Sequence, residues 1–394
     1  MDQVPRRILL GTLGSATLAA TAGCLARARD AVTSVSTPDP GPPDYRRWLP
    51  APASLPAEQA DYDPSHLSLA DLRDAGVYET ATGTRNLFAR SGRDYLGVDD
   101  AEIERVVKLS VQHATVLQGS FAADPVAATL DATGYEPAGE HAGYRLFART
   151  DTDHAVGVAD GVAVLSRFDR PLDVVRAVID AGRGARPRFH EASAAFARLS
   201  DALGGATLAW LFPDATGQGP EGAVANGTST QFAGDRAFLR LVYLFASGSD
   251  VSAADVRSSV ADGFVDDPFG SLDVAVEGDR ATVETARAAG AVADGTAPLQ
   301  PILTLGFERD GTGDAVVVRH EGGDTARADL LQVRGAAGPT DAQFTDEHDS
   351  FGPGDALAVP ASELGDPGER RLRVSWSTPS GDAASSLAVS DLDA

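Results

Sequence analysis

The chain has 394 residues, with 57 acidic side chains against 33 basic ones and a single cysteine, for a formal net charge of −24. This acidic balance disfavours nucleic-acid binding, which needs clustered Lys and Arg. Lys108 is the only lysine, so a GxxxxGK phosphate loop is absent and any lysine-based chemistry would rest on that residue. One cysteine excludes intramolecular disulfides, CxxC redox pairs and multi-cysteine zinc sites.

The acid excess comes with abundant Ala, Asp, Gly and Thr and almost no lysine. This composition resembles that of haloarchaeal proteins, which keep a hydrated carboxylate surface at molar salt. The Debye length there falls to about 3 Å, so that self-repulsion is tolerated. The resemblance implies that the charge is an adaptation to solvent rather than a binding site for cations or basic partners.

The first residues predict an export signal. Arg6 and Arg7 precede the uncharged run Ile8–Ala22, whose 15 residues fall short of the ~20 needed to span a bilayer. Thr21-Ala22-Gly23-Cys24 follows and resembles a lipobox, which implies cleavage before Cys24 and a lipid thioether on its sulfur. We therefore expect residues 1–23 to be a twin-arginine signal peptide. The mature protein is expected on the outer face of the membrane, held by the lipid on Cys24.

Residues 24–60 are expected to be the lipid anchor and a Pro-, Ser- and Thr-rich tether, because prolines cluster near residue 40 and favour extended backbone. From 61 to 288, short apolar runs alternate with amphipathic segments, which predicts an α+β domain. The elements expected in its first part are strands over 106–121 (one strand or a pair), 144–148 and 155–165, and helices over 125–132 and 171–182. Asp160-Gly161 marks a hairpin turn, and Pro171 a helix start.

The β-α-β-β-α order of this first part is that of a ferredoxin-like, split β-α-β unit. A second pass of similar order predicts a pseudo-repeat with a break near 200–205. Its expected elements are helices over 191–203 and from 252, and strands over 206–212, 237–245, 272–276 and 281–285. The region resembles uncharacterised haloarchaeal lipoproteins with a GSF element, an acid-led helix, a hairpin and a VIDAG helix end, here residues 119–121, 124–132, 155–165 and 178–182.

After a Gly- and Ala-rich connector, residues 298–394 have a different pattern of apolar residues. Short alternating runs, which predict a β-sandwich, cover 303–307, 315–320, 329–333, 357–359, 372–376 and 387–389. Gly322-Gly323-Asp324, Gly354-Asp355 and Trp376 give this part a resemblance to the Ig-like β-domain of archaeal type IV pilin-like proteins. Pilins carry a long hydrophobic helix before this domain, whereas this chain has a lipobox, so we expect no filament.

Catalytic motifs are missing: the chain has no GxSxG, HExxH, GxGxxG after a strand or CxxC. Its seven histidines are dispersed with no local metal pair, and we expect no metal and no cofactor. His113, inside an apolar run, is the histidine least typical of a surface position. Asn226-Gly227-Thr228 is the only Asn-x-Ser/Thr sequon and is expected in a loop, where glycosylation is plausible and an unmodified loop is the alternative.

These features predict a non-enzymatic, lipid-anchored surface protein that presents interaction domains to envelope partners, with no nucleic-acid ligand. A solute-binding lipoprotein of a transporter is the first alternative, because such proteins are tethered in the same way. A hydrolase whose Asp, His and Ser residues come together only in the fold is the second.

Overall fold

The computed structural model describes residues 37–57, 61–110, 114–167, 169–214, 219–263, 272–291, 298–366, 370–381 and 384–391. They form two compact units, each assembled from separate parts of the chain. Unit 1 contains the described residues of 1–51, 63–84 and 187–297, and unit 2 those of 52–62, 85–186 and 298–394. The expected division at residue 298 is therefore not the main one, because the C-terminal segment clusters with residues 85–186.

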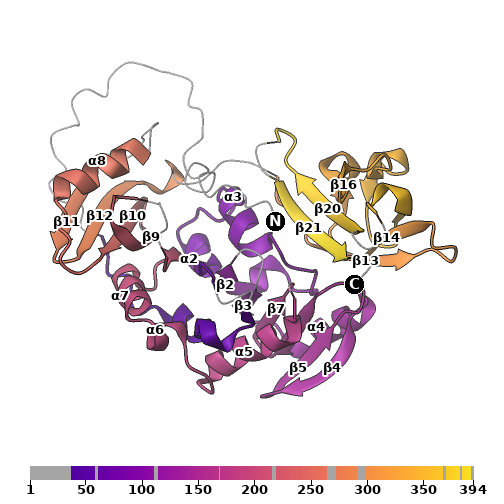
Figure 1. Ribbon diagram of the computed structural model, residues 1–394, viewed down its shortest axis with the longest axis horizontal. Helices are drawn as coiled ribbons and strands as arrows, with labels where there is room; N and C mark the ends of the chain where they lie inside the picture. Colours follow the sequence, from indigo (N-terminus) through magenta and orange to yellow (C-terminus); the bar gives the residue numbers. More distant parts are fainter. Residues whose placement is uncertain are drawn as a thin grey trace. The chain divides into compact units, whose positions relative to one another are not determined.

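Unit 1 is built on antiparallel strands in the order β11-β12-β10-β9-β8-β1. The strands are β1 (Ser65–Ser68), β8 (Leu208–Phe212), β9 (Ala223–Ala233), β10 (Arg236–Phe245), β11 (Asp273–Glu277) and β12 (Arg280–Ala288). The helices are α2 (Leu69–Asp74), α3 (Thr82–Thr84), α6 (Phe189–Ala192), α7 (Ala194–Leu203) and α8 (Ala253–Gly263), with the 3-10 turns η1 (Asp44–Trp48) and η6 (Ala289–Ala291). Helix α7 packs on β8, β9 and β10, and α8 packs on β11 and β12 (Figure 1).

Part of the segment expected to be a tether is folded into unit 1. Tyr45, Trp48 and Leu49 are buried. Gly205 N donates a 3.0 Å hydrogen bond to Gly41 O, and Phe189 N donates a 2.9 Å bond to Leu49 O. Aromatic and aliphatic side chains that can be buried outweigh the proline signal here, so the predicted tether through residue 60 is too long.

Unit 2 begins with a second set of antiparallel strands, in the order β2-β3-β7-β6-β5-β4. They are β2 (Ile103–Ser110), β3 (Ala114–Gly119), β4 (Glu136–His141), β5 (Tyr144–Ala148), β6 (Ala155–Ala159) and β7 (Val162–Ser166). Helices α4 (Ala123–Ala132) and α5 (Pro171–Arg183) pack on this sheet. The other turns are η2 (Pro52–Ser54), the π-helical η4 (Arg85–Arg90) and η5 (Asp100–Glu102).

Helix α5 shows how local sequence positions these elements. Pro171 stands at its first turn, and Val174, Val178 and Ile179 form its fully buried face. The helix was expected to end at Gly182, but it continues to Arg183, and Gly184, with φ 74°, is its C-cap. Glycine adopts that left-handed conformation without a Cβ clash. The helix therefore ends at Arg183, one residue later than expected.

The C-terminal part of unit 2 is all β apart from short 3-10 turns. Its strands are β13 (Leu303–Arg309), β14 (Ala315–Gly323), β15 (Ala326–Arg327), β16 (Leu331–Gly335), β17 (Gly338–Pro339), β18 (Ser350–Phe351), β19 (Ala356–Pro360), β20 (Arg371–Ser377) and β21 (Ala384–Asp391), and its turns are η7 (Ala328–Leu330), η8 (Phe344–Asp346) and η9 (Ala361–Glu363). They form antiparallel sheets in the orders β13-β14-β19, β15-β18 and β17-β16-β20-β21. One core containing Val318, Phe351 and Trp376 lies among them.

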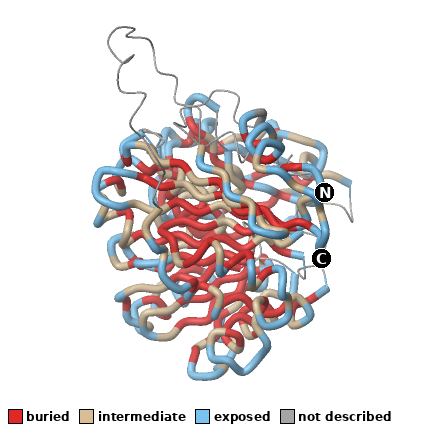
Figure 2. Tube along the Cα trace, turned by 90° about the vertical axis from the view of Figure 1, so that its left-hand side faces the viewer, coloured by how far each residue is buried: buried red, intermediate tan, exposed pale blue. Residues whose placement is uncertain are grey.

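The prediction of an α+β protein is confirmed, with mostly antiparallel strands. Buried residues lie mainly along the strands, whereas exposed residues lie mainly at the turns (Figure 2). The sequence patterns missed the strands β1, β4 and β9 and the two-residue strands β15, β17 and β18. Strand β4 is largely exposed, so it has no apolar alternation, and β9 has a Gly-, Ser- and Thr-rich sequence that was expected to be a loop. No helix in the described ranges combines the length and apolarity needed to cross a bilayer.

Candidate functional site

The residues expected to direct export and anchoring, Arg6, Arg7 and Cys24, lie outside the described residues, and so does His113. Asn226 is described and differs from expectation. It lies within β9, opposite Phe212 on one side and Tyr243 on the other, and is only 6% exposed. The predicted loop is therefore a strand, and the Asn226 side chain is buried, because the small polar residues of β9 pair with two apolar neighbouring strands.

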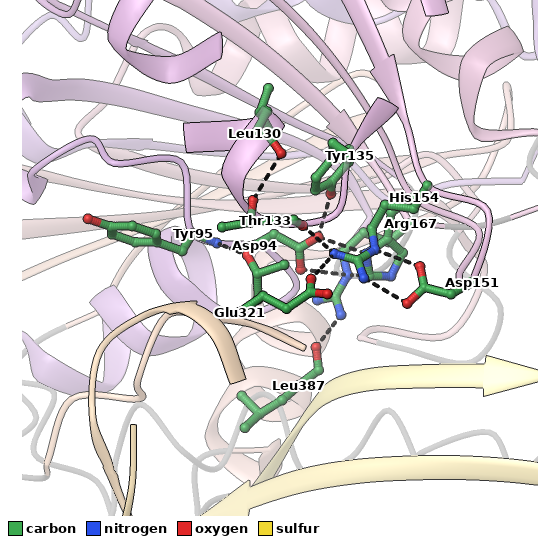
Figure 3. Close-up of polar contacts among 12 residues, drawn as sticks. Asp94, Tyr95, Leu130, Thr133, Tyr135, Asp151, His154, Arg167, Glu321 and Leu387 are labelled. Carbon is green, nitrogen blue, oxygen red and sulfur yellow. Dashed lines mark hydrogen bonds and ion pairs between the residues drawn. The ribbon is translucent and has the colours of Figure 1, made fainter. Parts of the chain in front are cut away.

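The structure instead brings together charged residues inside unit 2. At their centre is Asp94, whose side chain is 3% exposed (Figure 3). Tyr135 Oη donates to Asp94 Oδ2 at 2.5 Å, and His154 Nδ1 lies 2.7 Å from the same oxygen. Burial by itself would raise the pKa of the Asp94 carboxyl, but His154, Arg167 and the hydrogen bonds from His154 and Tyr135 bring it well below its usual range. Asp94 is therefore an ionised carboxylate in a buried site.

An Asp–His pair of this kind can serve as a catalytic dyad only if the second ring nitrogen is available. Here Arg167 Nε donates to His154 Nε2 at 3.1 Å. Because a guanidinium can donate but not accept a hydrogen bond, His154 Nε2 is the acceptor and His154 Nδ1 carries the hydrogen donated to Asp94. Burial lowers the pKa of His154, Asp94 raises it and Arg167 lowers it again, and the net shift is downward, in keeping with a neutral ring. Both ring nitrogens are thus used within the protein.

Arg149, whose side chain is 1% exposed, connects this sheet to the C-terminal strands of unit 2. Its Nη1 donates to Thr133 O at 2.6 Å and to Glu321 Oε2 at 2.7 Å. Its Nε and Nη2 make a bidentate contact with Asp151 at 2.8 and 2.7 Å. Burial would lower the pKa of Arg149, but the contacts with Asp151 and Glu321 raise it, so its charge is permanent.

Two backbone groups and one hydroxyl of the C-terminal strands complete this contact. Phe307 N donates to Asp151 Oδ2 at 3.0 Å, and Ser390 Oγ donates to Asp151 O at 3.0 Å. Arg167 Nη2 donates to Leu387 O (Figure 3). Polar groups of Asp151 and Arg167, which lie in loops beside the sheet, are thus satisfied by polar groups of β13 and β21.

A second cluster surrounds Asp100, next to η4. Arg90 Nη1 and Arg93 Nη2 approach its two carboxylate oxygens at 2.6 and 3.0 Å. Arg90 also donates to Asp324 Oδ2 and to Gln300 O, both at 2.5 Å. Burial would raise the pKa of the Asp100 carboxyl, but Arg93 and Arg90 lower it. The cluster joins the η4 region to the segment that begins at residue 298.

Lys108, the only lysine, is buried on β2 and 1% exposed. Its Nζ donates to Ser91 O at 2.6 Å, Ser91 Oγ at 2.9 Å and Leu87 O at 3.1 Å, which are all uncharged acceptors. Burial, with repulsion from Arg93 and Arg167, lowers its pKa to about 7. The side chain is inaccessible to a carbonyl substrate, and so the geometry does not favour Schiff-base chemistry at Lys108.

Sequence reasoning did not single out these clusters as sites. The available signal was weak: a lone lysine within an apolar strand, and three arginines and an aspartate in the short stretch 85–94. Their partners are far away in sequence, at 321, 324 and 387. Within the ranges described, no three His, Cys, Asp or Glu groups gather in a way that could hold a metal ion.

Comparisons with known proteins add little to this geometry. No family model and no curated protein matches the chain. Among solved structures, crystal forms I and III of TP0453, a spirochete protein, match with TM-scores of 0.39 and 0.38 and sequence identities of 11% and 9%. Each match covers 62% of this chain, and 94% or 96% of TP0453. Likeness at this level carries no argument about function.

Proposed function

We propose that this chain is a non-enzymatic, lipid-anchored protein on the outer face of an archaeal membrane, where it presents folded interaction domains to envelope partners. The observation that carries the proposal is the order Arg6-Arg7, uncharged run, Ala22-Gly23-Cys24, in which the sole cysteine follows a short apolar segment at lipobox spacing. Because two lipid chains give stable attachment, no membrane-spanning helix is needed.

The buried clusters of unit 2 support the non-enzymatic part of the proposal. His154, which pairs with Asp94 as a general base would, has its second nitrogen occupied by Arg167. The Lys108 ammonium is enclosed by backbone and hydroxyl oxygens. The groups best suited to acid–base or nucleophilic work therefore stabilise the fold, which is the expected use of buried polar networks in a scaffold.

The finer architecture belongs to the same proposal. The α+β region 61–288 is taken as two ferredoxin-like pseudo-repeats with a break near 200–205, and 298–394 as an Ig-like β-sandwich. Antiparallel sheets that share one apolar core, including Phe351 and Trp376, support the sandwich. The acidic surface is taken as an adaptation to a halophilic environment, and the twin-arginine route, which carries folded cargo, suits a protein that folds before it meets high salt.

Metabolic labelling with a lipid precursor tests the anchor. The wild-type chain is expected to incorporate label and to sediment with membranes, whereas Cys24→Ser is expected to incorporate none, because the chain has no other cysteine. Replacing both Arg6 and Arg7 by Lys is the matched control for export, and should leave an unprocessed precursor inside the cell. Equal labelling of the wild type and Cys24→Ser would overturn the anchor.

Two screens of the chain produced without its lipid test the non-enzymatic part. A thermal-shift screen of small solutes measures binding, and an activity screen of hydrolase substrates measures turnover. No saturable ligand and no turnover are expected. One saturable solute would favour a transporter-linked binding protein instead. Turnover abolished by a single Asp, His or Ser substitution would favour a hydrolase.

A further inference from the structure

A chain of three hydrogen bonds connects Asp94, inside unit 2, to strand β21 (Figure 3). His154 Nδ1 donates to Asp94 Oδ2 at 2.7 Å, and His154 Nε2 accepts from Arg167 Nε at 3.1 Å. Arg167 Nη2 in turn donates to Leu387 O on β21. This chain of bonds is complete only while His154 Nε2 carries no hydrogen, so the attachment of β21 requires a neutral imidazole.

A proton on His154 would break this chain of bonds at Nε2. The new N–H would face the N–H of Arg167 Nε across 3.1 Å, so that two donors on two cations would oppose each other. Arg167 has another acceptor near by, because its Nε lies 3.9 Å from Asp94 Oδ1. A turn of the guanidinium toward that oxygen would exchange its contacts with His154 and Leu387 for a closer ion pair with Asp94.

Several charged or titratable groups face His154, and together with burial they keep its ring neutral at pH 7. They are Asp94 with its partner Tyr135, Arg167, and Arg149 with its partners Asp151 and Glu321. Burial lowers the pKa of the ring, Asp94 raises it, and Arg167 and Arg149 lower it again, with a net downward shift from 6.5. Because folding lowers this pKa, the unfolded chain binds more protons below pH 6.5, and acidification weakens the folded arrangement.

We propose that His154 is an acid-sensitive latch, which holds β21 to the sheet of unit 2 at neutral pH and releases it on acidification. The neutral ring accepts from Arg167 and keeps its guanidinium on Leu387 O. The other hydrogen bond of β21 to this region, from Ser390 Oγ to Asp151 O, contains no titrating group. Strand β21 is the edge strand in the order β17-β16-β20-β21, so without the latch it is held mainly by β20 and frays more readily.

Hydrogen exchange at pH 7 and pH 5, measured by mass spectrometry on the full chain from residue 24, tests the latch. After correction for the intrinsic effect of pH on exchange, protection of residues 384–391 should fall by about 5- to 25-fold relative to β12 of unit 1. His154→Asn cannot gain a proton and should show no such fall. His141→Asn is the matched control and should keep it, because His141 pairs with Asp180, which is not part of the latch.

Nitrogen-15 NMR of the histidine-labelled wild type gives a measurement that does not depend on the folding of any variant. One ring should carry its hydrogen on Nδ1 at pH 7, as His154 does, and should gain a proton over the pH range in which β21 loses protection. Release of β21 while no such ring titrates would overturn the latch. Unchanged protection of β21 in the wild type, or an equal loss in His154→Asn, would overturn it as well.

Discussion

Arg149 Nη1 lies 2.7 Å from Glu321 Oε2, which joins two residues 172 positions apart. One guanidinium thereby binds a loop of the sheet, the end of α4 through Thr133 O, and strand β14. Buried ion pairs with several hydrogen bonds are costly to break because the partner charges are left uncompensated. We infer that Arg149 holds the C-terminal strands of unit 2 to its sheet.

Replacing this residue in Arg149→Met should lower the free energy of unfolding by about 3 kcal/mol, because Asp151 and Glu321 lose their shared cation. Urea unfolding followed by circular dichroism measures the change. Arg145→Met is the matched control: its pair with Asp124 is exposed, at 38% and 94% of the side chains, and should contribute less than ~1 kcal/mol. Equal losses in both variants would contradict the role assigned to Arg149.

Local elements of this protein were predictable where apolar periodicity and turn residues coincide. Pro171, the Val174–Ile179 stripe and the Asp160-Gly161 turn each indicate the observed α5 or the β6–β7 hairpin. The proposed signal peptide also rests on a sequence pattern, and its residues lie outside the described ranges. Strand β4 has no such signal because it lies at a sheet edge with little burial.

The charge clusters were not predictable in the same way. Nothing in the sequence near Arg90 specifies Asp324 as a partner, and nothing near Arg149 specifies Glu321. These pairs depend on how residues 298–394 pack on residues 85–186, and the pattern of turns instead indicated a separate C-terminal domain. Non-local packing decides which charges of such an acidic chain become buried.

Helix α5 packs so closely on β6 that we expect no room for a side chain at Gly157. A Cβ there would lie 2.9 Å from both Val175 Cγ1 and Ile179 Cδ1. Gly157→Ala should therefore destabilise the protein by about 1–3 kcal/mol through overpacking, measured by the shift of the urea midpoint. Gly311→Ala, where no heavy atom lies within 4 Å of the added Cβ, is the control and should change stability by less than ~0.5 kcal/mol. A neutral Gly157→Ala would mean that α5 moves freely away from β6.

The burial of Asn226 in β9 predicts that its sequon stays unmodified, because the folded protein does not present this side chain to a glycosyltransferase. Intact-mass spectrometry of the protein from its glycosylating host should show no glycan on the wild type. Asp310→Asn creates the same Asn-Gly-Thr triplet in the turn between β13 and β14, where Gly311 and Thr312 are exposed. That variant is expected to gain glycan mass. A glycan on Asn226 in the wild type would show that modification precedes folding.

The lowered pKa of Lys108 predicts that the free energy of unfolding rises with pH. Its pKa falls from 10.5 in the unfolded chain to about 7 in the folded one, so between these values the unfolded chain binds more protons, and raising the pH favours folding. From pH 7 to 9.5 the gain should be about 3 kcal/mol. The series stops at 9.5 because tyrosines ionise in the unfolded chain near pH 10.

Urea unfolding at each pH measures this slope. Lys108→Met retains every other titrating group, so the difference between the two curves isolates Lys108. The variant should be more stable than the wild type at pH 7 relative to pH 9.5, by the same ~3 kcal/mol. Parallel curves for the wild type and Lys108→Met would show that Lys108 keeps an ordinary pKa in the folded chain and would contradict this prediction.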